Sequence, residues 1–271
     1  MENNLKRTVL RDCKRIVVKV GTTSLTYPNG RMDLKRMQSL SWVLTDLRSQ
    51  GRDVVLVSSG AIAVGADRLG LGQRPRDTIG KQAASAVGQA ALMQIYENFF
   101  LSVNQKVAQI LLTKDVLDDE TRKTHARNTF FALFAMGVIP IVNENDTIAI
   151  DELGFSENDT LAAYVACLVE SDCLIFLSDS DGLYDKDPRT DALARRISRV
   201  DRIDDAVYHS AGEAGTDLGT GGMAAKVSAA AMATEAGIDA LIASGEEPTI
   251  LFRLLHGDEL GTWFPAKAEK G

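Results

Sequence analysis

Short apolar segments alternate with longer amphipathic ones along most of the chain. Each short segment has five or six residues and is rich in Val, Ile and Leu, as is typical of parallel strands buried on both faces. Strands are predicted at residues 15–20, 53–57, 107–112, 138–142, 173–177 and 238–243. A helix is predicted between Asp33, as its N-cap, and Gly51, and others over residues 81–100, 123–136, 158–169 and 222–236. This alternation predicts an α/β fold with a mostly parallel sheet.

The 271 residues contain no linker rich in Pro, Gly and Ser, no internal repeat and no low-complexity tract. We therefore expect one compact unit, which could be built as two lobes on one shared sheet.

The composition excludes several classes of protein. With 37 acidic and 30 basic residues, a net charge of -7 and no basic block, general nucleic-acid binding is disfavoured. The three histidines are not paired at metal-ligand spacing, which disfavours both histidine-based zinc chemistry and a Ser-His-Asp hydrolase. No apolar run approaches the roughly 18–20 residues of a membrane span, and the N-terminus is too charged for a signal peptide. With three scattered cysteines, expected to be reduced, these features predict a cytoplasmic protein that binds neither nucleic acid nor membrane.

Small polar residues follow the predicted strands. In open α/β sheets, ligands bind beyond the carboxyl ends of the strands, so we expect a polar ligand there. The segments that follow the first five strands are residues 21–24, 58–61, 113–115, 143–146 and 178–182.

Lys19 lies inside an otherwise apolar strand, where a lysine is costly unless it is paired or bound to a ligand. The glycine and hydroxyl residues that follow it favour a lysine that faces phosphate. The alternative is an edge strand on which Lys19 faces solvent.

Two glycine segments could supply backbone amides to an anion. Residues 58–63 lead from a strand into small residues that can start a helix. Residues 219–226 fit G-x-G-x-x-A, but no strand precedes them, so a dinucleotide site is disfavoured. With Lys226 in its first turn, the second segment suits a triphosphate instead. The alternatives are a tight strand-to-helix turn for the first segment and an unliganded surface loop for the second.

Acids and amides gather at residues 143–146 and 157–159. Such groups could hold an amino-acid ammonium group, Mg²⁺ or the two lysines. Capping of a helix by Asn158 or Asp159 is a competing and compatible role.

Taken together, these segments resemble the amino-acid kinase family, and within it the branch whose members phosphorylate the side-chain carboxylate of glutamate. The resemblance extends in family order over about residues 14–263. The matching segments are residues 18–22, 57–63, 81–82, 142–146, 157–159, 178–179 with 182–184, and 219–223 with Lys226. It implies a three-layer αβα sandwich and phosphoryl transfer from ATP, with Mg²⁺ held through the ATP phosphates rather than by protein side chains.

The resemblance also implies roles for individual residues. Lys19 and Lys226 would be catalytic and contact ATP, and Asp159 would orient them. Residues expected to bind glutamate are Ser59, Asn143, Asp146 and Asn158, with Gly60 and Ala61 adding backbone amides. Residues expected to bind ATP are Ser178, Asp179, Thr220, Gly221, Gly222, Met223, Ala224 and Ala225. By the same resemblance, residues 1–172 would form the amino-acid lobe and 173–271 the ATP lobe.

Three departures from the family pattern are visible, at Glu157, at Ser178 and at the pair Ala224-Ala225. All three keep the charges, but the pair Ala224-Ala225 lacks hydroxyl groups that could contact phosphate or Mg²⁺. Many relatives also carry a C-terminal PUA domain, which is not expected here because the chain ends soon after Phe264.

Two alternatives stay open at this point. One is another member of the family, such as an acetylglutamate, aspartate or uridylate kinase. The other is a catalytically silent sensor of amino acid or nucleotide, which would have no need to keep Lys19, Asp159 and Lys226. The resemblance further implies self-association, feedback inhibition by proline and transient contact with a glutamyl-phosphate reductase.

Overall fold

The computed structural model describes residues 7–149, 158–212 and 222–267. Within them, the strands form one sheet in the order β3-β4-β2-β1-β5-β6-β7. All neighbouring strands pair in parallel except β6 and β7, which are antiparallel. The strands are β1 (Arg15–Val20), β2 (Asp53–Ser58), β3 (Val107–Leu112), β4 (Ile139–Glu144), β5 (Cys173–Ser178), β6 (Asp239–Ser244) and β7 (Thr262–Phe264). The predicted α/β fold with a mostly parallel sheet is confirmed.

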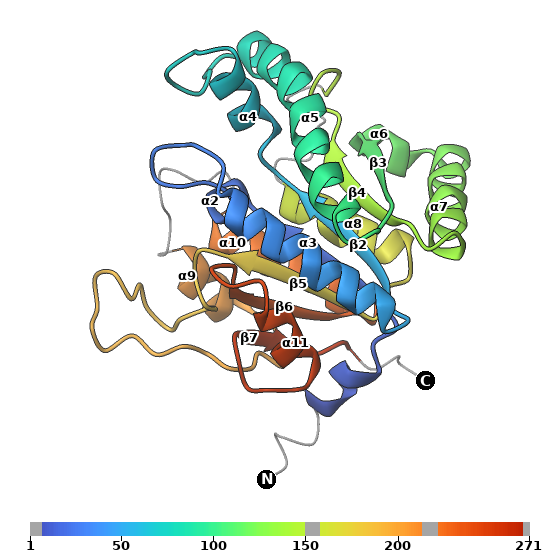
Figure 1. The fold of residues 1–271 in the computed structure, drawn as a ribbon. Coiled ribbons are helices and arrows are strands. Elements are labelled where there is room, and N and C mark those ends of the chain that lie inside the picture. Colours follow the sequence, from blue (N-terminus) through green and yellow to red (C-terminus); the bar gives the residue numbers. More distant parts are fainter. Residues whose placement is uncertain (1–6, 150–157, 213–221, 268–271) are drawn as a thin grey trace.

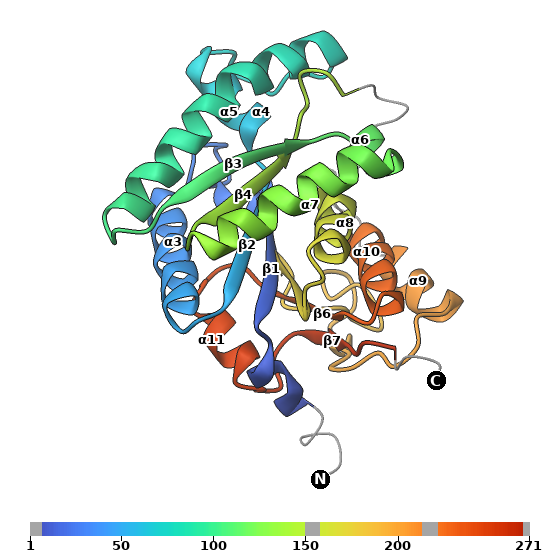
Figure 2. The ribbon, with the colours of Figure 1, turned by 90° about the vertical axis from the view of Figure 1, so that its right-hand side faces the viewer.

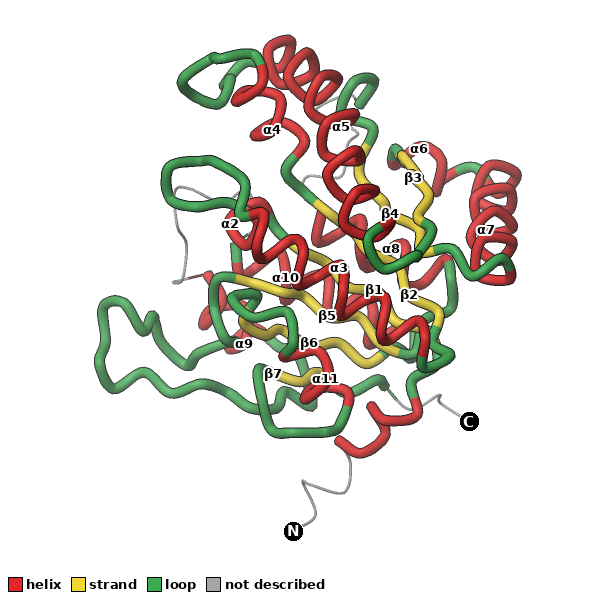
Figure 3. The backbone as a smooth tube through the Cα atoms, in the orientation of Figure 1, coloured by secondary structure: helices red, strands yellow, loops and turns green. Residues whose placement is uncertain are grey.

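Helices cover both faces of this sheet and complete a three-layer sandwich (Figures 1 and 2). One face is covered by α3 (Leu34–Ser49), α5 (Thr78–Leu101) and α11 (Ile250–Leu255). The other face is covered by α7 (Glu120–Ala135), α8 (Asn158–Leu168) and α10 (Met223–Glu235). The shorter helices are the 3-10 helix η1 (Thr8–Asp12), α2 (Thr22–Leu25), α4 (Ala61–Arg68), α6 (Lys114–Asp118) and α9 (Asp205–Gly212). A long loop joins β5 to α9 (Figure 3).

The predicted strands and helices are all present, with shifts at some ends. The helices α5 and α7 begin three residues earlier than predicted, behind Asp77 and Asp119. Both aspartates accept hydrogen bonds from backbone amides of the first turn. Because these first turns are largely polar and stabilised by their caps, the hydrophobic period does not reveal them. The sequence did not predict the short elements α11 and β7, because they have too few residues to show a periodic pattern.

The strand β1 lies at the point where the chain order of the sheet reverses. From β1 the chain continues through α3 to β2 on one side, and it later returns through α8 to β5 on the other side. Such a reversal opens a crevice at the carboxyl ends of the strands, because the flanking connections leave in opposite directions. The ligand site expected from the sequence therefore falls at the end of β1.

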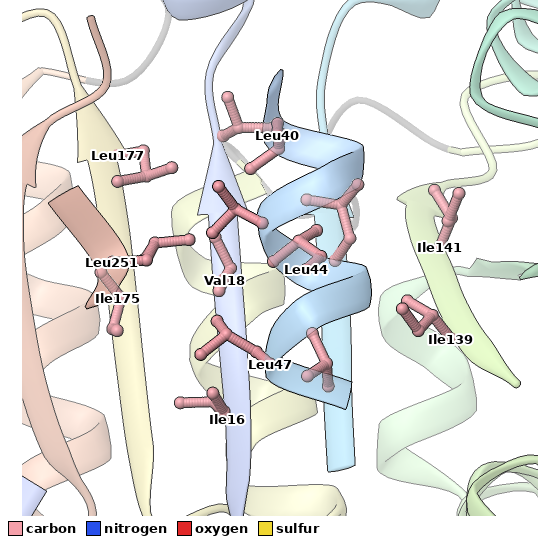
Figure 4. Packing of buried hydrophobic residues seen from close by; sticks show 14 of the residues in the cluster. Ile16, Val18, Leu40, Leu44, Leu47, Ile139, Ile141, Ile175, Leu177 and Leu251 are labelled. Carbon is pink, nitrogen blue, oxygen red and sulfur yellow. The ribbon is translucent and has the colours of Figure 1, made fainter. Parts of the chain in front are cut away.

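Alternation along β1 determines which side chains face each helical layer. Ile16 and Val18 pack toward α3, where Leu44 lies in the same buried cluster (Figure 4). Val17 belongs to the cluster on the opposite face, beneath α8 and α10. Because successive side chains of a strand point to opposite faces, Lys19 faces the same side as Val17.

The helices α4 and α5 pack unusually closely through two glycines. A methyl group added at Gly65 would lie 1.7 Å from the carbonyl oxygen of Ala84, and one added at Gly88 would lie 1.8 Å from that of Ala61. Real contacts of that length do not occur, so both positions require glycine. The close packing fixes both ends of the loop at residues 69–77 that joins the two helices.

We expect Gly88→Ala to lower the melting temperature, even though alanine normally favours a helix over glycine. The added methyl group must push α4 away from α5, which costs roughly 1–3 kcal/mol of unfolding free energy. Thermal unfolding followed by circular dichroism measures this. Gly212→Ala is the matched control because a methyl group there meets no atom of the described residues within 4 Å. Equal melting temperatures for the two variants would contradict the close helix contact.

Candidate functional site

A cavity of about 380 Å³ opens at the carboxyl ends of β1 and β5. Its lining comes from both halves of the chain: Lys19, Ser59, Arg74 and Asn158 from the first part, and Ser178, Asp179, Gly222, Met223 and Lys226 from the second. Each of these residues except Arg74 is a site residue predicted from the sequence. The other predicted site residues are not in the described lining.

One carboxylate joins the two predicted catalytic lysines. The Nζ atom of Lys19 lies 2.6 Å from Oδ1 of Asp159, and that of Lys226 lies 3.2 Å from Oδ2. Lys19 and Lys226 are only 4 % and 6 % exposed, and Asp159 is fully buried. The alternative of a solvent-facing Lys19 on an edge strand is wrong, because β1 lies between β2 and β5.

The cluster formed by Lys19, Asp159 and Lys226 carries a net charge of +1 when all three groups are ionised. A buried charge is costly unless it is paired, and one carboxylate cannot neutralise two ammonium groups. Since both lysines line the cavity, their charge would attract an anion bound there. The cluster is therefore suited to a ligand that carries a concentrated negative charge, such as a phosphoryl group.

A chain of amide hydrogen bonds extends away from this cluster. The Nδ2 group of Asn158 donates to Ser59 Oγ at 2.9 Å and to Asn143 Oδ1 at 2.7 Å. Asn143 in turn donates to Gln89 Oε1 at 2.8 Å. The described part of α8 begins at Asn158, directly after residues that lie outside the described structure, so capping by Asn158 or Asp159 stays a prediction. Asn143 supports Asn158 from behind and is not itself part of the cavity lining.

The predicted substrate residue Asp146 is positioned by α5. Ser85 donates a hydrogen bond to Asp146 Oδ2 at 2.7 Å, and Gln82 donates to the carbonyl of Ala149 in the same loop. Burial raises the pKa of Asp146, while the Ser85 hydrogen bond and the charge of Arg74 oppose the rise. Asp146 is not in the described cavity lining, but its charge interacts with that of Arg74, which is part of the lining.

The predicted nucleotide residues divide into three groups. Ser178 and Asp179 line the cavity, with Ser178 Oγ donating to Asp179 at 3.0 Å, and so do Gly222 and Met223. Ala224 is exposed, and neither it nor Ala225 belongs to the described lining. Thr220 and Gly221 lie outside the described residues, as does the departure at Glu157.

Gly60 and Ala61 mark the start of α4 rather than the cavity wall. Gly60 has a φ of +112°, a conformation that favours glycine, and Ala61 is buried against α5. Neither residue is in the described lining. Their predicted contribution of backbone amides stays a prediction.

Sequence reasoning missed Arg74, Ser85 and Gln89. Ser85 and Gln89 are one helical turn apart on the buried face of α5, among apolar residues such as Leu92. Polar residues at core positions of a helix normally have a hydrogen-bond partner, and that signal was available in the sequence. Arg74 follows no periodic pattern, and only the fold brings its loop to the cavity.

A family model described as the amino acid kinase family matches residues 14–244. The chain belongs to the amino acid kinase family. Among curated relatives of this amino acid kinase, the glutamate 5-kinase of Clostridium perfringens is 51% identical and covers 96% of this chain and 98% of its own. The glutamate 5-kinase of Cyanothece sp. is also 51% identical, over 92% of this chain and 68% of its own.

Among solved structures, the UMP kinase of Bacillus anthracis resembles this amino acid kinase with a TM-score of 0.62 and covers 94% of this chain and 97% of its own. At 16% identity, this likeness shows the fold alone. The three-layer sandwich expected from the resemblance is thereby confirmed. No helix among the described residues is long and apolar enough to cross a membrane.

We expect Asp159→Asn to lower the free energy of unfolding by roughly 3–5 kcal/mol, because two buried ammonium groups lose their shared carboxylate. Urea denaturation measures the change, and added pyrophosphate should restore part of it by binding between the lysines. The control is Asp115→Asn, since Asp115 pairs with Arg122 at the exposed surface and should contribute less than about 1 kcal/mol. Similar losses in both variants would show that the buried cluster has no special role.

Proposed function

We propose that this amino acid kinase transfers the γ-phosphoryl group of ATP to the side-chain carboxylate of L-glutamate. The products are L-glutamyl 5-phosphate and ADP, and the reaction is the first step of proline biosynthesis from glutamate. The proposal rests on one observation: two buried lysines form ion pairs with the carboxylate of Asp159, at one end of the hydrogen-bond network of Asn158. The name glutamate 5-kinase, borne by relatives that match nearly the whole chain, supports it.

The substrate needs no general base. A glutamate side chain has a pKa near 4.3, so its carboxylate is already ionised at neutral pH and can attack phosphorus directly. This agrees with a cavity whose described lining contains no histidine. Catalysis then depends on aligning the two anions and neutralising charge on the phosphoryl oxygens.

Lys19 and Lys226 supply that neutralisation in this mechanism. They approach from different elements, β1 and α10, and Asp159 on α8 holds both ammonium groups from one side. Preorganised charges in a largely buried site stabilise the transition state without having to reorganise during the reaction. Asp159 therefore acts as a positioning residue rather than as an acid or base.

The two substrates would occupy opposite sides of the lysine pair. We assign glutamate to the side of Ser59 and Asn158, in line with an amino-acid lobe at residues 1–172. We assign ATP to the side of Ser178, Asp179 and the start of α10, in line with a nucleotide lobe at residues 173–271.

Mg²⁺ fits this arrangement as a partner of ATP. The described residues contain no group of three His, Cys, Asp or Glu side chains that could hold a metal ion. Mg²⁺ in kinases commonly takes substrate phosphates, waters and only one or two carboxylates. Asp179 and Asp181 line the cavity and are the acids that would contact it. When bound, Mg²⁺ would neutralise part of the phosphate charge.

Four further predictions from the sequence stay predictions: location in the cytoplasm, self-association, inhibition by proline and contact with a reductase.

We expect Lys19→Ala and Lys226→Ala each to lower kcat for ADP release by roughly 100- to 1,000-fold, because each removes a charge that stabilises the transition state. Coupled ADP release with L-glutamate and ATP measures this. Lys14→Ala is the matched control, since Lys14 is exposed immediately before β1. Near-normal turnover of either variant would contradict charge neutralisation, and no ADP release by the unaltered enzyme with any amino acid would favour a silent sensor.

We expect Asp146→Ala to raise KM for L-glutamate by roughly tenfold or more, because it removes a carboxylate that is expected to bind glutamate. KM for ATP should change little. Asp179→Asn provides the reciprocal control and should raise KM for ATP instead. Equal effects of Asp146→Ala on both KM values would place Asp146 outside the glutamate site.

A further inference from the structure

Arg74 lines the cavity, but the mechanism above gives it no function. The described cavity lining carries four basic side chains: Lys19, Arg74, Arg189 and Lys226. The two lysines are held by Asp159, and Arg189 donates to both carboxylate oxygens of Asp187 at 3.0 and 2.8 Å. Within the described residues, no hydrogen bond or ion pair holds the guanidinium group of Arg74. No described residue therefore occupies its donors, which can bind a ligand in the cavity.

The side chain of Arg74 is exposed, but both ends of its loop are held in place. Its loop, residues 69–77, lies on the side of the molecule at which β1 and β5 end (Figure 1). One end of the loop follows α4, and the other is closed by Asp77, which caps α5. The glycine contacts between α4 and α5 hold these ends together. Pro75 also restricts the backbone of Arg74, because a residue before proline avoids the helical region.

Asp146 places an opposite charge beside Arg74. The charge of each residue acts on the other, and Ser85 holds the carboxylate of Asp146 from α5. Burial raises the pKa of Asp146, as expected for a carboxylate that is not fully solvated. The guanidinium group of Arg74, which lines the cavity, and the carboxylate beside it form a pair that matches a zwitterion.

We propose that Arg74 binds the α-carboxylate of the amino-acid substrate while Asp146 binds its α-ammonium group. This inference rests on the proposed function and adds the residue that recognises the second carboxylate. Glutamate carries two carboxylates, and the one that reacts must lie near Lys19 and Lys226. The other needs a cation of its own, and a guanidinium group can bind a carboxylate through two parallel hydrogen bonds.

The assignment explains how the enzyme selects an amino acid rather than any carboxylate. A substrate without the α-carboxylate would give Arg74 no carboxylate of the ligand to bind. Binding would then lose the charge-assisted hydrogen bonds at one end, although the reacting carboxylate is unchanged. Arg74 is therefore a specificity-determining residue that acts on KM more than on kcat.

The test compares Arg74→Gln with the unaltered enzyme on two substrates. One is L-glutamate, and the other is L-isoglutamine, in which the α-carboxylate is a carboxamide while the ammonium group and the reacting carboxylate remain. We expect Arg74→Gln to raise KM for L-glutamate by roughly 10- to 100-fold. KM for L-isoglutamine and KM for ATP should stay within about twofold, and kcat should change little. Arg76→Gln removes the same charge from the same loop, outside the described lining, and should leave all values unchanged.

The possible results separate the two proposals. If the unaltered enzyme phosphorylates L-glutamate but Arg74→Gln leaves its KM unchanged, only the role of Arg74 is overturned. An equal rise of KM for L-glutamate and L-isoglutamine also overturns it, because a general disturbance of the loop would act on both substrates. A rise of KM for ATP alone would place Arg74 at the nucleotide instead. Failure of the unaltered enzyme to phosphorylate L-glutamate would overturn both proposals.

Discussion

The site depends on one carboxylate shared by two buried ammonium groups. Asp159 brings Lys19 of β1 and Lys226 of α10 close together, although 207 positions separate the two lysines in the sequence. Without an acid between them, two like charges at this depth would repel each other and lose hydration. With it, the two lysines and Asp159 form a centre whose three groups together carry a net positive charge, which suits a phosphoryl group in transit between two anions.

The fold provides the rigid frame that this cluster requires. β1 is central and hydrogen-bonded on both sides, so the position of Lys19 is determined by the sheet itself. α8 and α10 pack on the same face and share a buried apolar cluster, which fixes Asp159 and Lys226 relative to β1. Most of the cost of burying polar groups at the carboxyl ends of the strands is therefore offset by apolar packing below them.

The side of the cavity that we assign to the amino acid is built on the contact between α4 and α5. Two glycines allow the helices to touch, and α5 then contributes Ser85 to Asp146 and Gln89 to Asn143. The loop between the same helices carries Arg74. One tight helix pair thus positions both the amide network and the charged groups that we assign to the substrate's head group, whereas the phosphoryl end depends on β1, α8 and α10.

The sequence by itself determined the order of strands and helices, because the hydrophobic period of each element is a local property, and it singled out Lys19, Asp159 and Lys226 through motifs. It could not show that Lys19 is central rather than at an edge, since strand order depends on pairing between distant segments. It also missed Ser85, Gln89 and Arg74. Their function arises only where α5 and its preceding loop meet the ends of β4 and β1, and tertiary packing alone decides that meeting.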